Sequence, residues 1–186
     1  AEDVKSTGAK RNSIMCAGDG IVGRGVLLDV PRLRGQAWLE PQEAIEPAEL
    51  EAAEQAQGVQ VATGDVLLVA TGRDARRAEK GPWDPVGGGL AGLHPDCIPW
   101  LHERGIAVLG SDGVSDPLPG NGPEGWPMPV HQCALVAMGV HLLDNLRLDR
   151  LSEACAGHGQ WSVLFQVAPL RVDQGTGSPI NPIAVL

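Results

Sequence analysis

Short, largely apolar runs, each too short to form a stable helix, constrain the fold of this chain more than any other feature. They occupy residues 26–30, 66–70 and 106–109, and a longer run follows at 161–168. Apolar runs of about four to eight residues bounded by Gly or Pro are typical of strands that are buried on both faces. The sequence therefore predicts a sheet whose strands lie inside the protein.

Helical patterns lie between these runs. The clearest covers residues 46–58, where Pro47 suits the first turn and Gly58 is a natural stop. Strands that alternate with helices indicate an α/β domain in which helices layer against a sheet. We predict further helices at residues 95–105, 131–138 and 148–156, and loops at residues 73–89, at the proline-rich 116–129 and in the C-terminal tail.

The length of 186 residues suits one domain with a short extension. Residues 1–20 show little periodicity, and we expect them to form a connector or arm. Residues 21–186 are then expected to form a single α/β domain. The chain has no Tyr and one Phe, so its core must be built mainly from Leu, Val and Ile.

Composition and charge argue against several classes of protein. The net charge is −9, and the densest basic stretch, residues 73–80, also holds Asp74 and Glu79, which disfavours nucleic-acid binding. No apolar run approaches the length of a membrane span, and the polar N-terminal residues do not resemble a secretory signal. The four cysteines are widely spaced without a CxxC pair, which favours reduced thiols and a cytoplasmic location.

One histidine and one aspartate form the main candidate site. His131 opens an apolar helix after the proline-rich loop, and Asp144 lies between leucines in the segment that follows that helix. Burying a carboxylate in such a setting is costly unless it is paired or bound to a metal. Imidazole and carboxylate are suitable ligands for zinc or manganese. A structural histidine and a capping aspartate are the alternative interpretation.

Three further residues are candidates for a substrate pocket. Asp112 follows the run at 106–109, at the end of a strand where α/β domains tend to bind ligands; an ordinary turn is an equally good interpretation. His94 precedes Pro95 and is also suited to cap a helix. His141 lies three residues before Asp144, so it either lines the same cavity or is simply half-buried.

Motifs spread over residues 21–184 resemble the cyclase family of metal-dependent hydrolases, which includes kynurenine formamidase and isatin hydrolase. The resemblance implies a swivelling β/β/α domain and a divalent metal, zinc or manganese, that activates water for hydrolysis of a small-molecule amide, formamide or cyclic amide. The motifs are GRGVLLD at 23–29, GDVLLVATG at 64–72, GSD at 110–112, PVH at 129–131, LDNL at 143–146, APL at 168–170 and GSPINP at 177–182.

The resemblance also assigns metal ligands. His131 matches the later metal-site histidine of the family, and Asp144 matches a position where many members carry glutamate before Asn-Leu. The family places its main ligands in an early His-x-x-x-His-x-Asp motif, and no histidine precedes Ile21. The resemblance therefore implies the C-terminal part of such an enzyme, incomplete as a single chain and expected to form a homo-oligomer.

Two other functions remain open at this point. One is a non-catalytic interaction or scaffold protein that keeps the fold without the metal. The other is a lyase or cyclase of natural-product metabolism, which keeps the pocket and changes the reaction.

Overall fold

The computed structural model describes residues 3–119, 122 and 124–186. The chain divides into two compact units, which we describe separately. The larger unit is Gly25–Ser162, and the smaller one combines Ala1–Arg24 with Val163–Leu186. Pro123, in the loop predicted at 116–129, lies outside the described residues.

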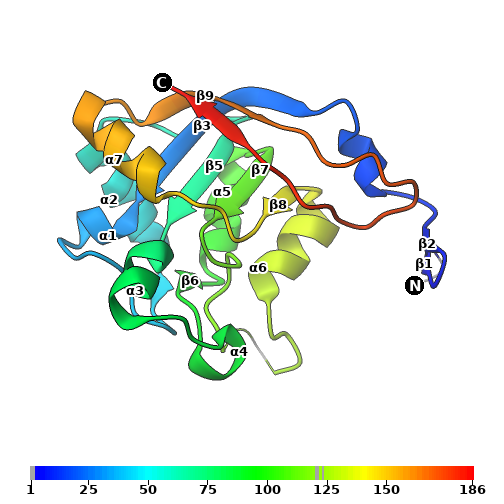
Figure 1. The fold of residues 1–186 in the computed structure, drawn as a ribbon, viewed down its shortest axis with the longest axis horizontal. Coiled ribbons are helices and arrows are strands. Elements are labelled where there is room, and N and C mark those ends of the chain that lie inside the picture. Colours follow the sequence, from blue (N-terminus) through cyan, green and yellow to red (C-terminus); the bar gives the residue numbers. More distant parts are fainter. Residues whose placement is uncertain (1–2, 120–121, 123) are drawn as a thin grey trace. The chain divides into compact units, whose positions relative to one another are not determined.

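Parallel strands form the centre of the larger unit (Figure 1). They are β3 (Ile21–Asp29), which enters from the smaller unit, β5 (Val66–Ala70), β7 (Val108–Ser111) and β8 (His141–Leu143), in the order β3-β5-β7-β8. Leu27 pairs with Leu68, and Leu68 pairs with Gly110. The strand predicted at 66–70 is confirmed. The one predicted at 106–109 begins two residues later and continues to Ser111.

Helices connect these strands and begin and end largely where predicted. The helix α2 (Pro47–Gln57) carries a capping box made by Glu46 and Glu49 and ends at Gly58, which adopts a left-handed conformation. The others are α1 (Val30–Leu33), α5 (Cys97–Arg104), α6 (Pro129–Gln132) with its π-helical continuation η2 (Cys133–Met138), and α7 (Asp149–His158). A small parallel pair is formed by β4 (Ala44–Ile45) and β6 (Gly92–Leu93).

The loop predicted at 73–89 is wrong, because this segment contains α3 (Arg73–Lys80) and the single turn α4 (Pro85–Gly88). None of the described residues of α3 is buried. A helix without an apolar stripe lacks the periodicity by which helices are recognised in a sequence. The start of α3 is instead held by a tertiary contact, in which the Asp112 carboxylate accepts hydrogen bonds from the backbone N–H groups of Gly72 and Arg73.

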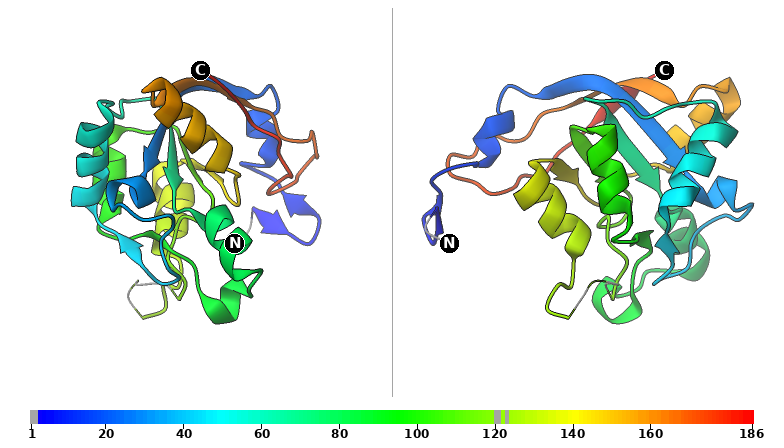
Figure 2. Two further views of the ribbon diagram at one scale, coloured as in Figure 1. Left: turned by 60° about the vertical axis from the view of Figure 1, so that its left-hand side comes forward. Right: turned by 180° about the vertical axis from the view of Figure 1, so that it is seen from behind.

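The main core lies between one face of the parallel strands and the helices α2, α5 and α6, which Figure 2 shows on the same side of the strands. Alternate residues Val26 and Leu28 of β3 contribute to it, together with Leu50 of α2 and Leu101 of α5. The largest fully buried side chains are all Leu, Ile or Val. The predicted aliphatic core is therefore confirmed.

The smaller unit contains the antiparallel pair β1 (Val4–Lys5) and β2 (Gly8–Ala9), the short 3-10 helix η1 (Ile14–Ala17) and the first residues of β3. Its other strands are β9 (Ser162–Val167), which confirms the strand predicted at 161–168, and β10 (Ile183–Val185). These two strands are antiparallel, so the tail predicted as turns also contributes a strand. In the described part of the chain, no helix is long and apolar enough to cross a membrane.

Candidate functional site

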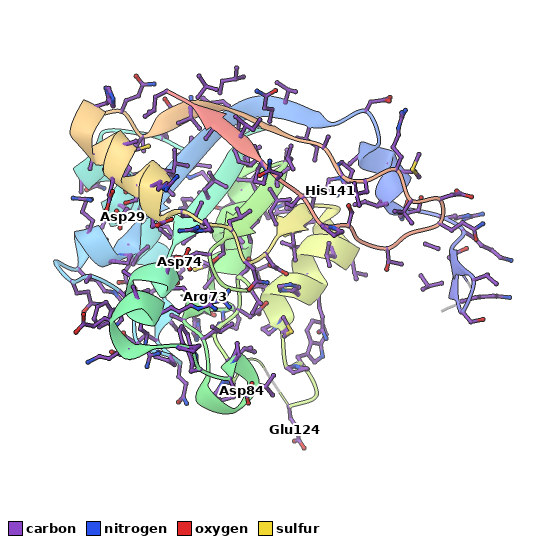
Figure 3. All side chains as sticks on the ribbon, viewed as in Figure 1. Asp29, Arg73, Asp74, Asp84, Glu124 and His141 are labelled. Carbon is purple, nitrogen blue, oxygen red and sulfur yellow. The ribbon has the colours of Figure 1, made fainter. Side chains whose placement is uncertain are left out.

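The carboxyl ends of the parallel strands bring polar side chains to one edge of the larger unit. Asp29 is the last residue of β3, Arg73 follows β5, Asp112 follows β7 and Asp144 follows β8. Figure 3 shows Asp29 and Arg73 near this edge, beside α7 and α3. In sheets of parallel strands, ligands bind outside the carboxyl ends, because loops rather than core side chains occupy that space.

His131 lies between two carboxylates. Its Nδ1 is 2.8 Å from Oδ2 of Asp116, and its Nε2 is 3.0 Å from Oδ2 of Asp144. The sequence singled out His131 and Asp144 as a candidate pair. The structure brings the two side chains together, with His131 on α6 and Asp144 after β8.

Asp116 is the site residue that the sequence analysis missed. Its side chain is fully buried and accepts hydrogen bonds from the backbone N–H groups of Val130 (2.8 Å) and His131 (3.0 Å), besides contacting the imidazole. It therefore fixes both the first turn of α6 and the orientation of the ring. The available signal was a second aspartate soon after the strand that leads to Asp112, in front of Pro117.

The two carboxylates change the protonation of the imidazole. Burial by itself lowers the pKa of His131, but the hydrogen bonds and charges of Asp116 and Asp144 raise it more. The result is a pKa of about 9 instead of the usual 6.5. Without a bound cation, His131 is therefore protonated at neutral pH and donates a hydrogen bond from each ring nitrogen.

The turn after β8 holds Asp144 in place. Asn145 adopts a left-handed conformation with φ of 58°, and its backbone N–H donates to the carbonyl oxygen of Gly113 at 2.8 Å. Nη1 of Arg73 donates to Oδ1 of Asn145 and, at 3.0 Å, to the carbonyl oxygen of Asp112. Asp144 Oδ1 is buried and has no hydrogen-bond partner among the described residues.

Asp112 lies at the same edge, but its carboxylate binds Thr71 and the start of α3 instead of His131. Its buried carboxylate accepts hydrogen bonds from N–H and Oγ1 of Thr71, each at 2.8 Å, as well as from the start of α3. Burial raises its pKa, and the hydrogen bonds from Thr71 oppose that rise. Asp112 also lines a cavity of about 440 Å³ together with Asp29 and Asp74. The structure thus places it beside a cavity, but it does not contact His131.

His94 and His141 lie in other surroundings. Nδ1 of His94 accepts a hydrogen bond from the backbone N–H of Asp96 at 3.2 Å, one residue before α5 begins. A possible metal-ligand cluster is formed by one atom each of Glu46, His94 and Asp96, which lie within 4.8 Å of one another. However, the Nδ1 lone pair of His94 accepts the hydrogen bond from Asp96, and both carboxylates are exposed. His141 is half-buried at the first position of β8, at the opposite end of the strand from Asp144.

Gly92 provides a test of how Asp116 is positioned. A Cβ atom added there would lie 2.6 Å from the carbonyl oxygen of Asp116 and 2.6 Å from the nitrogen of Pro117. Because these neighbours are backbone atoms, Gly92→Ala is expected to lower the free energy of unfolding by about 1–3 kcal/mol. Urea denaturation measures this change.

The matched control for that substitution is Gly157→Ala in α7, where an added Cβ would meet nothing within 4 Å. Alanine there should raise the free energy of unfolding by about 0.5–1 kcal/mol, because glycine is a poor helix former. Equal effects at the two positions would contradict the close approach of Gly92 to Asp116.

The sequence is similar to a known protein family and to a characterised enzyme. The model of the family described as "Putative cyclase" matches residues 6–116. The kynurenine formamidase of Bacillus cereus is 33% identical over 92 residues, which are 49% of this chain and 38% of that protein.

Solved structures are similar over most of the chain. The crystal structure of a novel cyclase matches with a TM-score of 0.85 and 29% identity, covering 100% of this chain and 62% of that one. Isatin hydrolase A from Labrenzia aggregata matches in fold, with a TM-score of 0.70, 23% identity and coverage of 92% and 64%. The chain therefore spans less than two thirds of the length of these relatives.

Proposed function

Because the chain belongs to the cyclase family, whose model matches residues 6–116, we propose that it forms the part of a metal-dependent hydrolase that carries His131 and Asp144 as metal ligands. The substrate is a small molecule, and the reaction hydrolyses the C–N bond of an amide, formamide or cyclic amide. The observation that carries the proposal is the contact of the His131 imidazole with one fully buried carboxylate and one at the strand edge. Self-association and a cytoplasmic location stay predictions from the sequence.

The residues present fit a divalent metal. Histidine ligands usually donate their second ring N–H to a carboxylate, which fixes the ring and makes the ligating nitrogen more basic. Asp116 provides that carboxylate at Nδ1, so Nε2 is the nitrogen left for a metal. Nε2 faces Asp144, whose Oδ1 is buried without a partner among the described residues. An imidazole nitrogen and a carboxylate oxygen suit zinc and manganese.

A metal bound there would lower the pKa of a water molecule and polarise the substrate carbonyl. Catalytic zinc sites have about three protein ligands, so His131 and Asp144 make up part of the set. We propose that the remaining ligands come from outside these 186 residues. They belong either to a longer form of the protein or to another polypeptide.

The chain's own residues orient this partial site. Asp116 holds the imidazole through the ring and the backbone of α6. Arg73 ties the ends of β5, β7 and β8 together, because its guanidinium contacts the residues that follow β7 and β8. A ligand pair held by such contacts needs little rearrangement when a cation binds.

The proposal is tested by titrating Zn²⁺ and Mn²⁺ into the 186-residue chain in a calorimeter. We expect His131→Ala and Asp144→Ala each to weaken binding at least about tenfold, as loss of one ligand from a small set should. His94→Ala is the matched control, because His94 belongs to the separate cluster with Glu46 and Asp96. Binding that survives His131→Ala and is lost with His94→Ala would overturn the assignment.

Activity is measured on a form extended by a His-x-x-x-His-x-Asp segment, with an N-formyl amide and a cyclic amide as substrates. Turnover that disappears in His131→Ala supports the proposed function. An extended form that binds neither metal and hydrolyses neither substrate would favour a non-catalytic scaffold instead.

A further inference from the structure

A second hollow lies beside the metal-ligand turn and is rich in arginine. It has a volume of about 590 Å³ and is lined by residues of α3, by the turn that contains Asn145 and by the start of α7. Asn145 directly follows Asp144 in the chain, so the hollow adjoins the proposed metal site. Its charged lining residues are Arg73, Asp74, Arg77, Arg147 and Asp149.

The charges in this hollow are not balanced. Arg147 lies 3.4 Å from both Asp74 and Asp149, so these three side chains partner one another. The guanidinium of Arg73 donates to two neutral oxygens, the backbone carbonyl oxygen of Asp112 and Oδ1 of Asn145, whereas its backbone N–H donates to the Asp112 carboxylate. Arg77 has no ion-pair partner among the residues that the structure describes. Three guanidinium groups and two carboxylates leave an excess of one positive charge, in a chain whose net charge is −9.

The guanidinium groups also retain hydrogen-bonding capacity. Arginine has five N–H donors in a planar fork that matches the two oxygens of a carboxylate. Both hydrogen bonds that the Arg73 guanidinium makes in the described structure are donated by Nη1. Figure 3 shows Arg73 and Asp74 next to each other at this edge of the larger unit. Donors of this kind, beside a reaction centre, are suited to hold the charged end of a substrate.

We infer that this hollow, lined by Arg73, Arg77 and Asn145, binds a single carboxylate group of the substrate. The inference rests on the proposed function and narrows it: the substrate is a small amide that also carries one carboxylate. The single negative charge of a carboxylate neutralises the one excess positive charge of the hollow, whereas a phosphate dianion would give the hollow a net negative charge. Arg77 is the specificity-determining residue, because its charge is not engaged elsewhere in the described structure.

The test uses the metal-free 186-residue chain with propionate and propionamide as probes, which share a shape and differ in charge. Binding is followed by NMR through the side-chain amide of Asn145. Propionate is expected to shift this signal in a saturable way, and propionamide is not. Arg77→Gln should weaken propionate binding about three- to fivefold, the range of an exposed charge pair. Arg150→Gln, which removes the same charge from α7 outside the hollow, should leave it unchanged.

Three results would overturn the inference. They are equal binding of propionate and propionamide, equal weakening by Arg77→Gln and Arg150→Gln, and tighter binding of inorganic phosphate than of propionate. Because the metal-free chain is used, the result is independent of the Zn²⁺ and Mn²⁺ titrations. Propionate binding without metal binding would contradict the hydrolase proposal and support the carboxylate site. Metal binding without propionate binding would support the hydrolase proposal and contradict the carboxylate site.

Discussion

Replacing Asp116 with alanine is expected to lower the free energy of unfolding by about 3–5 kcal/mol, the cost of removing one partner from a buried ionic pair. The Asp116 side chain is fully buried and accepts hydrogen bonds from two backbone N–H groups at the start of α6 and from the His131 ring. Truncation leaves all three donors without that acceptor. Urea denaturation followed by tryptophan fluorescence measures the change.

Asp144→Ala is the matched control, because Asp144 contacts the other nitrogen of the same imidazole. Its side chain is 31% exposed and it accepts one hydrogen bond from His131, so the expected loss is about 1 kcal/mol or less. Equal losses for the two variants would contradict the anchoring role of Asp116.

The milder variant Asp116→Asn separates anchoring of the ring from folding. Asparagine keeps the volume and one acceptor oxygen but removes the charge that favours protonated His131. The pKa of His131, followed by NMR of its ring protons, should fall from about 9 towards 6.5. Measured above pH 9, where His131 is deprotonated in both forms, metal affinity should fall by about ten- to a hundredfold, as for other carboxylates that orient a histidine ligand. A purely structural role would leave the pKa unchanged in the folded variant.

The metal-free chain is expected to lose stability as the pH rises from 6.5 through about 9. The pKa of His131 is higher in the folded chain than in the unfolded chain, so folding favours the protonated imidazole. This contribution is fully present below pH 6.5 and is lost once the pH exceeds the folded-state value. The rise from 6.5 to about 9 corresponds to roughly 3 kcal/mol.

The measurement compares the free energy of unfolding at pH 6 and above pH 9 for the wild type and for His131→Gln. The substitution should remove most of the difference between the two pH values. His102→Gln, at an exposed position of α5, is the control and should leave the difference intact. A pH dependence that persists without His131 would place its origin in another group.

Metal binding should show the opposite dependence on pH. A metal requires neutral His131, and at pH 7 the ring is almost fully protonated because its pKa is about 9. Binding should therefore release about one proton at pH 7, and the apparent affinity should rise about tenfold per pH unit up to pH 9. Calorimetry in buffers of different ionisation enthalpy measures the released proton.

Periodicity predicted the parts of the fold that bury an apolar pattern. The run at 66–70 is β5, which lies between Gly64 and Gly72, and the pattern at 46–58 is α2, which begins at Pro47 and ends before Gly58. It failed for α3, in which Ala75 and Ala78 are the only apolar residues and none is buried. The short strand β8 was not predicted, since three residues are too few to show a period.

The sequence by itself determined the aliphatic core and the alternation of strands and helices, because these depend on local composition, and its motifs named His131 and Asp144 as candidate metal ligands. Only the tertiary structure decided that Asp116 lies under the imidazole and that Arg73 reaches the turn at Asn145. These contacts join residues that are 15 and 72 positions apart in the chain. The fold decides which carboxylate contacts which donor, because it brings the strand ends together. Local sequence patterns do not predict these contacts.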